Sequence, residues 1–162
     1  MVSVTYTPIG IIHTPFTELR GMPLQSVAAQ GVTGYIDLAV EYQDGLQDIE
    51  GFSHLLLIYH LHLSQGHKLR AMPFLDDQPR GIFATRAPKR PNPIGLSIVR
   101  LVGIENSRLL IEDVDILDGT PLLDIKPYVP LFDDRMNARI GWFKTNIERV
   151  FSVRADERFV PK

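Results

Sequence analysis

Short runs in which apolar and polar residues alternate make up much of this chain, and proline or glycine separates most of them. Alternation with a period of two is typical of strands with one buried face. The pattern predicts strands over residues 4–13, 32–40, 53–63, 81–86, 96–105, 108–116 and 123–126. Many short strands joined by turns favour an antiparallel sheet that closes into a barrel or packs as a sandwich.

Helical spacing occurs in only two places, residues 46–50 and 133–150. In the second, apolar side chains recur at helical intervals, which predicts a C-terminal helix; they are Ile140, Phe143, Ile147 and Val150. Residues 64–80 form a long connection and are the expected mobile lid. The 162 residues contain no repeat and no linker, so we expect a single domain over residues 1–162.

Several protein classes are disfavoured by what the sequence lacks. No apolar run approaches the roughly 20 residues that span a bilayer, and the first ten residues lack the pattern of a secretory signal. There is no cysteine for a disulfide, a nucleophile or a metal. We therefore expect a cytoplasmic protein without a membrane partner. No two of the 12 glycines lie two positions apart, which argues against a Rossmann-type nucleotide site.

The strongest local signal is a cationic block in an acidic protein. The chain has a formal net charge of -2, yet residues 78–104 contain no carboxylate. Arg86, Lys89 and Arg90 lie among prolines, which restrict the backbone and stiffen the loop. Such a loop favours a site for an anionic ligand. Asn92, between two prolines, either holds a turn or offers its amide to a base or an amine.

Residues 109–125 have the opposite charge balance and contain no basic residue; their carboxylates are Glu112, Asp113, Asp115, Asp118 and Asp124. Asp124 shares a predicted strand face with Lys126, and Tyr128 follows. This arrangement is typical of either a structural ion pair or a binding site.

His60 and His62 lie two apart in a predicted strand, so their side chains face the same side. The spacing suits two metal ligands, but no third ligand is evident nearby. We therefore favour a buried or ligand-packing histidine pair and expect no metal.

Four segments together resemble the TsaA-like family, and the resemblance covers residues 5–132. They read IGIIHTPF, GFSHLLLIYHLH, GIFATRAPKRPNPIGLSIVRL and DILDGTPLLDIKPYVP. The family's best-known members are tRNA adenine N6-methyltransferases that act on threonylcarbamoyl-adenosine beside the anticodon. The resemblance implies a small antiparallel β-barrel that binds S-adenosylmethionine and works as a homodimer. Residues 133–155 would form a helical extension, and by this resemblance we expect a short form without the C-terminal domain of longer members.

The resemblance also implies roles for individual residues. The expected cofactor contacts are Ser26, Val27, Ala28, His62, Leu63, Arg86, Leu96, Leu122, Leu123, Asp124 and Ile125. Asp124 and Asn92, with Lys126 and Tyr128 nearby, are the candidates for orienting the acceptor amine. Phosphates of the tRNA would contact Arg86, Lys89 and Arg90. A non-catalytic S-adenosylmethionine-binding module or an RNA-binding module would use the same surfaces, so both alternatives stay open.

Overall fold

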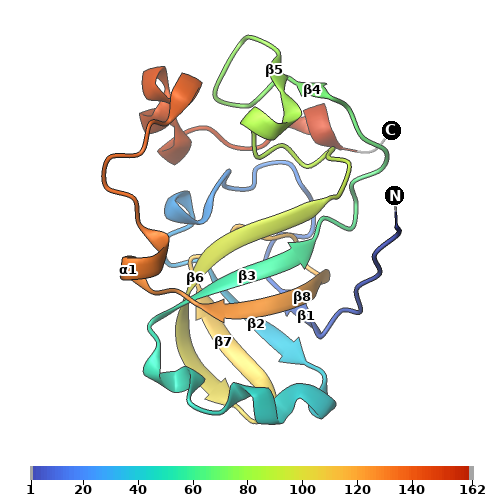
Figure 1. Cartoon of the computed structure of the whole chain (residues 1–162), viewed down its shortest axis with the longest axis vertical. Helices are drawn as coiled ribbons and strands as arrows, with labels where there is room; N and C mark the ends of the chain where they lie inside the picture. The colour runs from blue at the N-terminus through green and yellow to red at the C-terminus, as the bar shows by residue number, and fades with distance from the viewer. Residues whose placement is uncertain (1, 161–162) are drawn as a thin grey trace.

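The computed structural model describes residues 2–160, and at its centre six antiparallel strands form a closed barrel (Figure 1). The strands are β1 (Gly10–His13), β2 (Thr33–Leu38), β3 (His54–His60), β6 (Ile94–Glu105), β7 (Arg108–Glu112) and β8 (Thr120–Pro127). They follow the order β1-β2-β7-β6-β3-β8, and β1 closes the ring by pairing with both β2 and β8. The expected mainly β fold is confirmed.

Inward-facing aliphatic side chains fill the barrel. Every second residue of β3 is buried, which is the period that the sequence pattern predicts for a strand with one face in a core. The same alternation brings neighbouring strands into one core; its largest fully buried members are Ile12, Ile36, Leu55, Leu57, Leu109, Ile111, Ile116 and Leu122. Burial of these side chains supplies the main driving force for closing the sheet.

One pair of inward positions departs from this aliphatic pattern. Tyr59 of β3 lies directly opposite Gly95 of β6, and its ring occupies the space that a side chain at position 95 would need. A Cβ atom built on Gly95 would collide with three atoms of the ring. Glycine is therefore required at this position by the close approach of the tyrosine.

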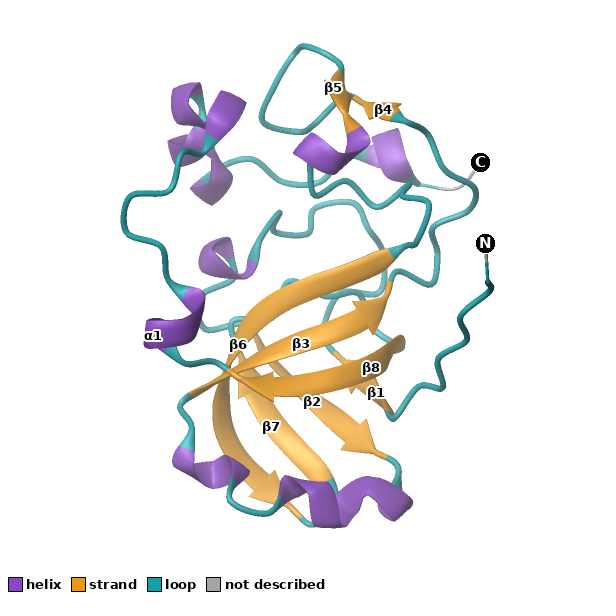
Figure 2. Cartoon of the chain, viewed as in Figure 1, coloured by secondary structure: helices purple, strands orange, loops and turns teal. Residues whose placement is uncertain are grey.

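Irregular segments cover the two ends of the barrel (Figure 2). At the lower end lie the 3-10 turns η2 (Val40–Leu46) and η3 (Ile49–Gly51). Over the upper end lie η1 (Ser26–Ala28), the short β4 (Arg70–Ala71) and β5 (Arg80–Gly81), η4 (Ile82–Ala84), η5 (Gly141–Thr145), η6 (Ile147–Phe151) and η7 (Glu157–Phe159). Among residues 2–160, no helix has the length and apolar character needed to cross a bilayer.

The last described segment ties the upper cover together. The carbonyl of Ala155 accepts a hydrogen bond from the Gly21 N–H at 2.8 Å. The Arg158 guanidinium donates to the carbonyl of Pro73 at 2.8 Å and lies 4.7 Å from the centre of the Phe74 ring. Segments that are far apart in the sequence therefore form one cover over the barrel.

The predicted C-terminal helix over residues 133–150 is wrong. The structure has one short helix, α1 (Pro130–Asp133), followed by the separate turns η5 and η6. Gly141, with a φ of 57°, adopts a left-handed conformation that a continuous helix does not allow. The helical spacing of the apolar residues reflects successive single turns that all face inward.

Three other sequence-based expectations need correction. The predicted strand over residues 81–86 ends at Gly81, and the chain then curls into η4. The predicted helix over residues 46–50 is instead the end of η2 and the start of η3, because Asp48 between them is left-handed with a φ of 65°. The strand predicted to reach residue 116 ends at Glu112, since Asp113 also has a φ of 65°.

We predict that Gly95→Ala destabilises the fold by about 1–3 kcal/mol, the usual cost of adding a methyl group to a filled interior. Urea unfolding followed by fluorescence measures this change. Gly81→Ala is the matched control, because a Cβ at position 81 meets nothing within 4 Å. Equal unfolding midpoints for Gly95→Ala and Gly81→Ala would contradict the steric role of Gly95.

Candidate functional site

A cavity of about 860 Å³ lies between the upper end of the barrel and its cover. Its volume falls within the range of about 300–1,000 Å³ that is typical of small-molecule sites. Most of its lining is apolar and comes from segments that are remote in sequence, including Met22, Leu61, Phe74, Leu75, Ile98, Ile116, Phe143, Ile147 and Val150. The C-terminal turns thus form one wall of the cavity.

A chain of hydrogen bonds forms the polar part of the cavity floor. The hydroxyls of Tyr59 and Ser97 are hydrogen-bonded at 2.9 Å. The Ser97 hydroxyl donates to a carboxylate oxygen of Asp115 at 2.6 Å. Tyr59 and Asp115 both line the cavity, so the floor presents a carboxyl group and a phenol within an apolar wall.

The carboxyl group of Asp115 has an unusual pKa. Burial raises the pKa of its carboxyl group to about 6, although the Ser97 hydroxyl and the nearby Arg86 guanidinium favour the charged form. Burial and the neighbouring Asp115 also raise the pKa of the Tyr59 hydroxyl. A carboxyl with a raised pKa in a cavity is typical of a group that binds a cation or exchanges a proton.

Arg86 supplies the opposite charge. Its side chain is exposed, lines the cavity, and donates a hydrogen bond to the side-chain carbonyl of Gln25. Arg86 and Asp115 thus place opposite charges in the cavity, whose lining also includes Arg90 and Glu148. Such a site suits a ligand that carries both an anionic and a cationic group on an apolar body.

The structure brings together six of the residues for which the sequence implies a cofactor contact. Ser26, Val27, His62, Leu63, Arg86 and Leu96 all line the cavity. Ala28 lies beside them in η1 but not among the lining residues. Nδ1 of His62 lies 3.4 Å from the Thr120 hydroxyl, and burial lowers the pKa of His62.

The β8 residues of the predicted cofactor set lie elsewhere. Leu122 is fully buried in the barrel core, and Ile125 packs against that core. Asp124 is opposite Ile58, which is in turn opposite Leu96, so these three form a row across adjacent strands on the outer face. Leu123 occupies the register shift beside Asp124. None of the four β8 residues lines the cavity, and their contact with a cofactor stays a prediction.

The four residues predicted to orient an acceptor also lie outside the cavity lining. Lys126 pairs with Asp124 at 2.7 Å, so the ion pair anticipated from the sequence is present. The Tyr128 hydroxyl donates to Asp134 at 2.7 Å, and this hydrogen bond raises the pKa of the tyrosine. Asn92 is exposed in its loop. Their roles in catalysis stay predictions.

The cationic loop is held by one of its own cations. Nη1 of Arg90 donates to the carbonyls of Ile82 at 3.1 Å and Thr85 at 2.8 Å. The Lys89 carbonyl accepts a hydrogen bond from Lys68 N–H at 3.1 Å. The loop is therefore stiffened by Arg90 as well as by its prolines, and part of the donor capacity of Arg90 is already used.

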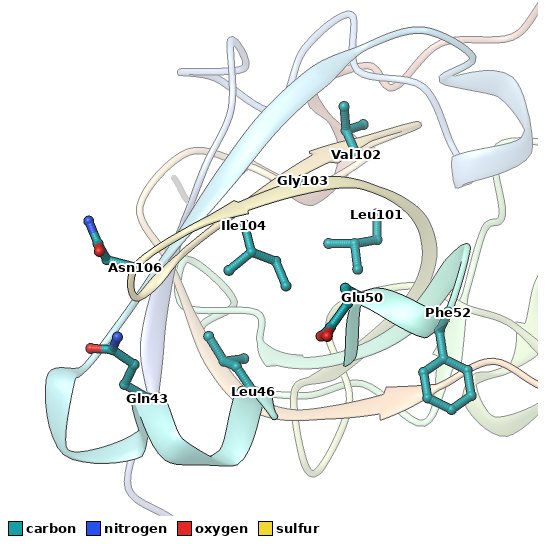
Figure 3. Close-up of a pocket in the computed structure, with 9 residues that line it drawn as sticks. All are labelled: Gln43, Leu46, Glu50, Phe52, Leu101, Val102, Gly103, Ile104 and Asn106. Atoms are coloured by element: carbon teal, nitrogen blue, oxygen red, sulfur yellow. The ribbon is translucent and has the colours of Figure 1, made fainter. Parts of the chain in front are cut away.

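A second hollow, of about 500 Å³, lies at the opposite end of the molecule (Figure 3). Leu46, Leu101 and Ile104 point toward one another at its base, and Glu50 is its only ionisable lining residue. No pair of opposite charges converges there. Within residues 2–160, no group of three or more potential metal ligands occurs at either end. We therefore assign the candidate site to the larger cavity.

Sequence reasoning missed Asp115, Tyr59 and Gln25. The tyrosine lies in an apolar run that reads as core, and the glutamine lies in a loop. Asp115 has a weak signal, because the buried residues Val114 and Ile116 flank it.

Comparison with known proteins shows similarity over most of the chain. A probable S-adenosyl-L-methionine-binding protein of Pyrococcus abyssi (strain GE5 / Orsay) is 53% identical over 156 residues, which cover 96% of this chain and 85% of that protein. The tRNA (adenine(37)-N6)-methyltransferase of Escherichia coli (strain K12) is 34% identical over 152 residues, which cover 88% of this chain and 65% of that protein.

A solved structure has the same fold. The crystal structure of TrmO from Pseudomonas aeruginosa matches with a TM-score of 0.74 and 38% identity. The match covers 88% of this chain but 62% of the TrmO chain, so this chain spans less than two thirds of that protein. The tRNA-methyltransferase O N-terminal domain matches residues 11–134, and the chain therefore belongs to this family.

Proposed function

We propose that the cavity binds S-adenosylmethionine and that the protein transfers its methyl group to an adenine amino group of tRNA, on threonylcarbamoyl-adenosine in the anticodon loop. The observation that carries the proposal is the presence of Asp115 and Arg86 in one largely apolar cavity. S-adenosylmethionine has a carboxylate, which is opposite in charge to Arg86, and cationic centres, which are opposite in charge to Asp115. Its adenine ring has flat faces that suit the apolar wall. When bound, it supplies a methyl group that is already activated by its sulfonium.

The residues of the cavity have distinct roles in this proposal. Arg86 pairs with the carboxylate of the methionine portion, and its bond to Gln25 holds it in position. Asp115 faces a cationic centre from the floor. Val27, Leu63 and Leu96 pack against the adenosine, while His62 offers a polar contact at the edge. Because the methyl group needs no further activation, the protein contributes alignment of donor and acceptor.

The acceptor amine loses a proton during the reaction. Asp115, with its raised pKa, is the cavity group suited to accept it. Asp124, Asn92, Lys126 and Tyr128 remain predicted orienting residues on the outer surface. Arg86 is exposed and Lys89 is half-buried, and both cations suit contacts with tRNA phosphates. An activity on tRNA agrees with a cytoplasmic location.

A binding module without catalysis is the second candidate. The Pyrococcus abyssi relative is named only as a probable binding protein, although it is 53% identical. The same cavity serves both functions, because cofactor binding needs Arg86 and Asp115 whether or not a methyl group is transferred. An assay that separates binding from transfer therefore decides between them.

The proposal includes a homodimer. Leu131, Phe132 and Met136 follow β8 and are strongly exposed, with Leu131 at 85% and Met136 at 94%. Exposed large apolar groups of this kind favour a protein interface. A second copy on this side of β8 would also cover Asp124, which otherwise faces solvent.

The first prediction from this proposal concerns activity. With labelled S-adenosylmethionine and total tRNA from a strain lacking the homologous enzyme, nucleoside mass spectrometry should detect methylated threonylcarbamoyl-adenosine. Arg86→Ala should weaken cofactor binding about 10–100-fold, the usual effect of losing a hydrogen bond to a charged group. Arg100→Ala, which removes a cation paired with Glu112 on the barrel surface, should leave binding unchanged. Binding without product on any tRNA would favour the non-catalytic module.

The second prediction is a dependence of cofactor affinity on pH. Because the folded pKa of Asp115 is about 6, acidification through this value removes the negative charge that faces the ligand's cation. Titration calorimetry should find affinity about tenfold weaker at pH 5 than at pH 7.5. In Asp115→Asn the affinity should be weak at both values. Parallel profiles for the wild type and the variant would contradict the assignment.

Urea unfolding of the Asp115→Asn variant is the control that tests whether this variant is folded. In the wild type, the raised pKa of Asp115 means that its ionised form opposes folding. The wild type therefore loses stability as the pH rises from about 4 through 6. The variant should therefore be at least as stable as the wild type at pH 7. Weak cofactor binding in such a variant reports the lost charge.

The third prediction concerns assembly. Light scattering should give the mass of a dimer for the wild type and of a monomer for Phe132→Glu, because a carboxylate is costly to bury in an apolar interface. Val40→Glu, at an exposed position at the start of η2, is the control and should stay dimeric. A monomeric wild type would refute this part of the proposal.

A further inference from the structure

Charge is distributed unequally along the long axis of the molecule. Residues 21–67 contain no lysine or arginine, and their carboxylates are Asp37, Glu41, Asp44, Asp48 and Glu50. All but Asp37 lie in or between η2 and η3, which cover the lower end of the barrel in Figure 1. Arg108 at this end is paired with Asp37, so the carboxylates of η2 and η3 leave an excess of negative charge that disfavours nucleic acid.

The end of the molecule that contains the cavity is rich in positive charge. Residues 78–99 and 135–147 contain no carboxylate and together supply Arg80, Arg86, Lys89, Arg90, Arg135, Arg139 and Lys144. The Asp76 carboxylate offsets Arg80, and Glu148 lies in the cavity wall. The balance around the cavity nevertheless remains positive, so an RNA strand is attracted to the same end of the molecule as the cavity.

A strongly exposed aromatic ring lies within this cationic end. Phe83, in η4, is 76% exposed, although the residue before it, Ile82, is fully buried. The guanidinium of Arg90 lies 5.9 Å from the centre of the Phe83 ring. A phenylalanine that leaves this much of its ring in water contributes little to the core, and its ring is free to contact a partner.

The backbone that carries Phe83 is held from several directions. Ile82 N–H donates to the Leu69 carbonyl at 3.0 Å, and the Ile82 carbonyl accepts from Arg90. On the other side of Phe83, the Ala84 carbonyl accepts a hydrogen bond from the indole of Trp142 at 2.8 Å. The ring is therefore presented from a pre-organised turn, which lowers the entropic cost of binding a partner.

We propose that Phe83 is a stacking platform for an unpaired base of the RNA substrate, next to the mouth of the cavity. This inference rests on the proposed function and specifies how its RNA is held. A rigid exposed ring among cations combines the two elements of single-strand recognition, base stacking and backbone attraction. Thr85 and Arg86, two and three residues further on, line the cavity, so a base on Phe83 lies close to the reacting position.

The test uses a single-stranded RNA of about ten nucleotides that contains one 2-aminopurine, whose fluorescence is quenched by stacking. Phe83→Ala should weaken binding about tenfold and remove the quenching, since one stacked base contributes an effect of this size. Phe83→Trp should retain both signals. Phe83→Leu keeps an apolar side chain but loses the ring, and should behave like Phe83→Ala.

Tyr42→Ala is the matched control, because Tyr42 is an aromatic residue that is 40% exposed at the acidic end. It should bind the RNA as the wild type does. Cofactor affinity, measured separately by calorimetry, should be unchanged in all four variants, so a loss confined to RNA binding assigns Phe83 to the platform.

The outcomes separate this inference from the proposed function. If the wild type methylates tRNA and Phe83→Ala binds RNA equally well, the platform is refuted and the enzyme activity stands. If the wild type binds cofactor but no RNA at low salt, both the platform and the tRNA substrate are refuted. Loss of RNA binding and quenching in Phe83→Ala alone supports the platform even where no methyl transfer is found.

Discussion

Closure of the barrel through β1 is the constraint on which the rest of the structure depends. This strand has only four residues, yet it pairs with both β2 and β8 and completes the ring. The close approach is possible because Gly10 and Gly34 lack side chains; a Cβ at either would lie 2.6 Å from a backbone oxygen across the β1–β2 pair. A closed ring leaves no strand edge free and fixes which end of each strand meets the cover.

The site is a consequence of this closure. Aliphatic side chains fill the barrel, but near its upper end Tyr59 and Ser97 occupy inward positions and carry a hydrogen-bond chain to Asp115. Because the cover encloses this end, Asp115 is largely shielded from bulk water, which raises its pKa to about 6. The fold thereby gives an ordinary aspartate a raised pKa, without a metal ligand set among the described residues.

The cover and the charge distribution then determine what can reach the site. Arg158 and Ala155 join the C-terminal segment to two loops that form the cavity walls. The acidic turns η2 and η3 are kept at the far end, while the loop around Arg90 gathers its cations beside the cavity mouth. A fold with a formal net charge of -2 can therefore offer a cationic face to an RNA strand.

The sequence by itself determined much of the barrel and part of the site. Alternation located the strands that contain Leu55, Val99 and Leu109, since burial of one face imposes a period of two on any strand. The motifs also led to Arg86, His62 and four other residues that do line the cavity. The end of β7 at Glu112 was not predictable, because it depends on the left-handed conformation of the next residue, Asp113. The curl after Gly81 was not predictable either, because it is held by a hydrogen bond from the Arg90 side chain.

Only the tertiary structure distinguished Asp115 from its neighbour Asp113. Both are aspartates in one acidic run, but Asp113 accepts a bond from the Gly31 N–H in a turn, whereas Asp115 lies under the cavity against Ser97. The tertiary structure likewise showed that Arg90 stabilises its loop by hydrogen bonds and that the C-terminal apolar residues lie on separate turns. Burial, hydrogen-bond partners and pKa are set by groups that the fold brings together from remote positions, and local sequence carries no record of them.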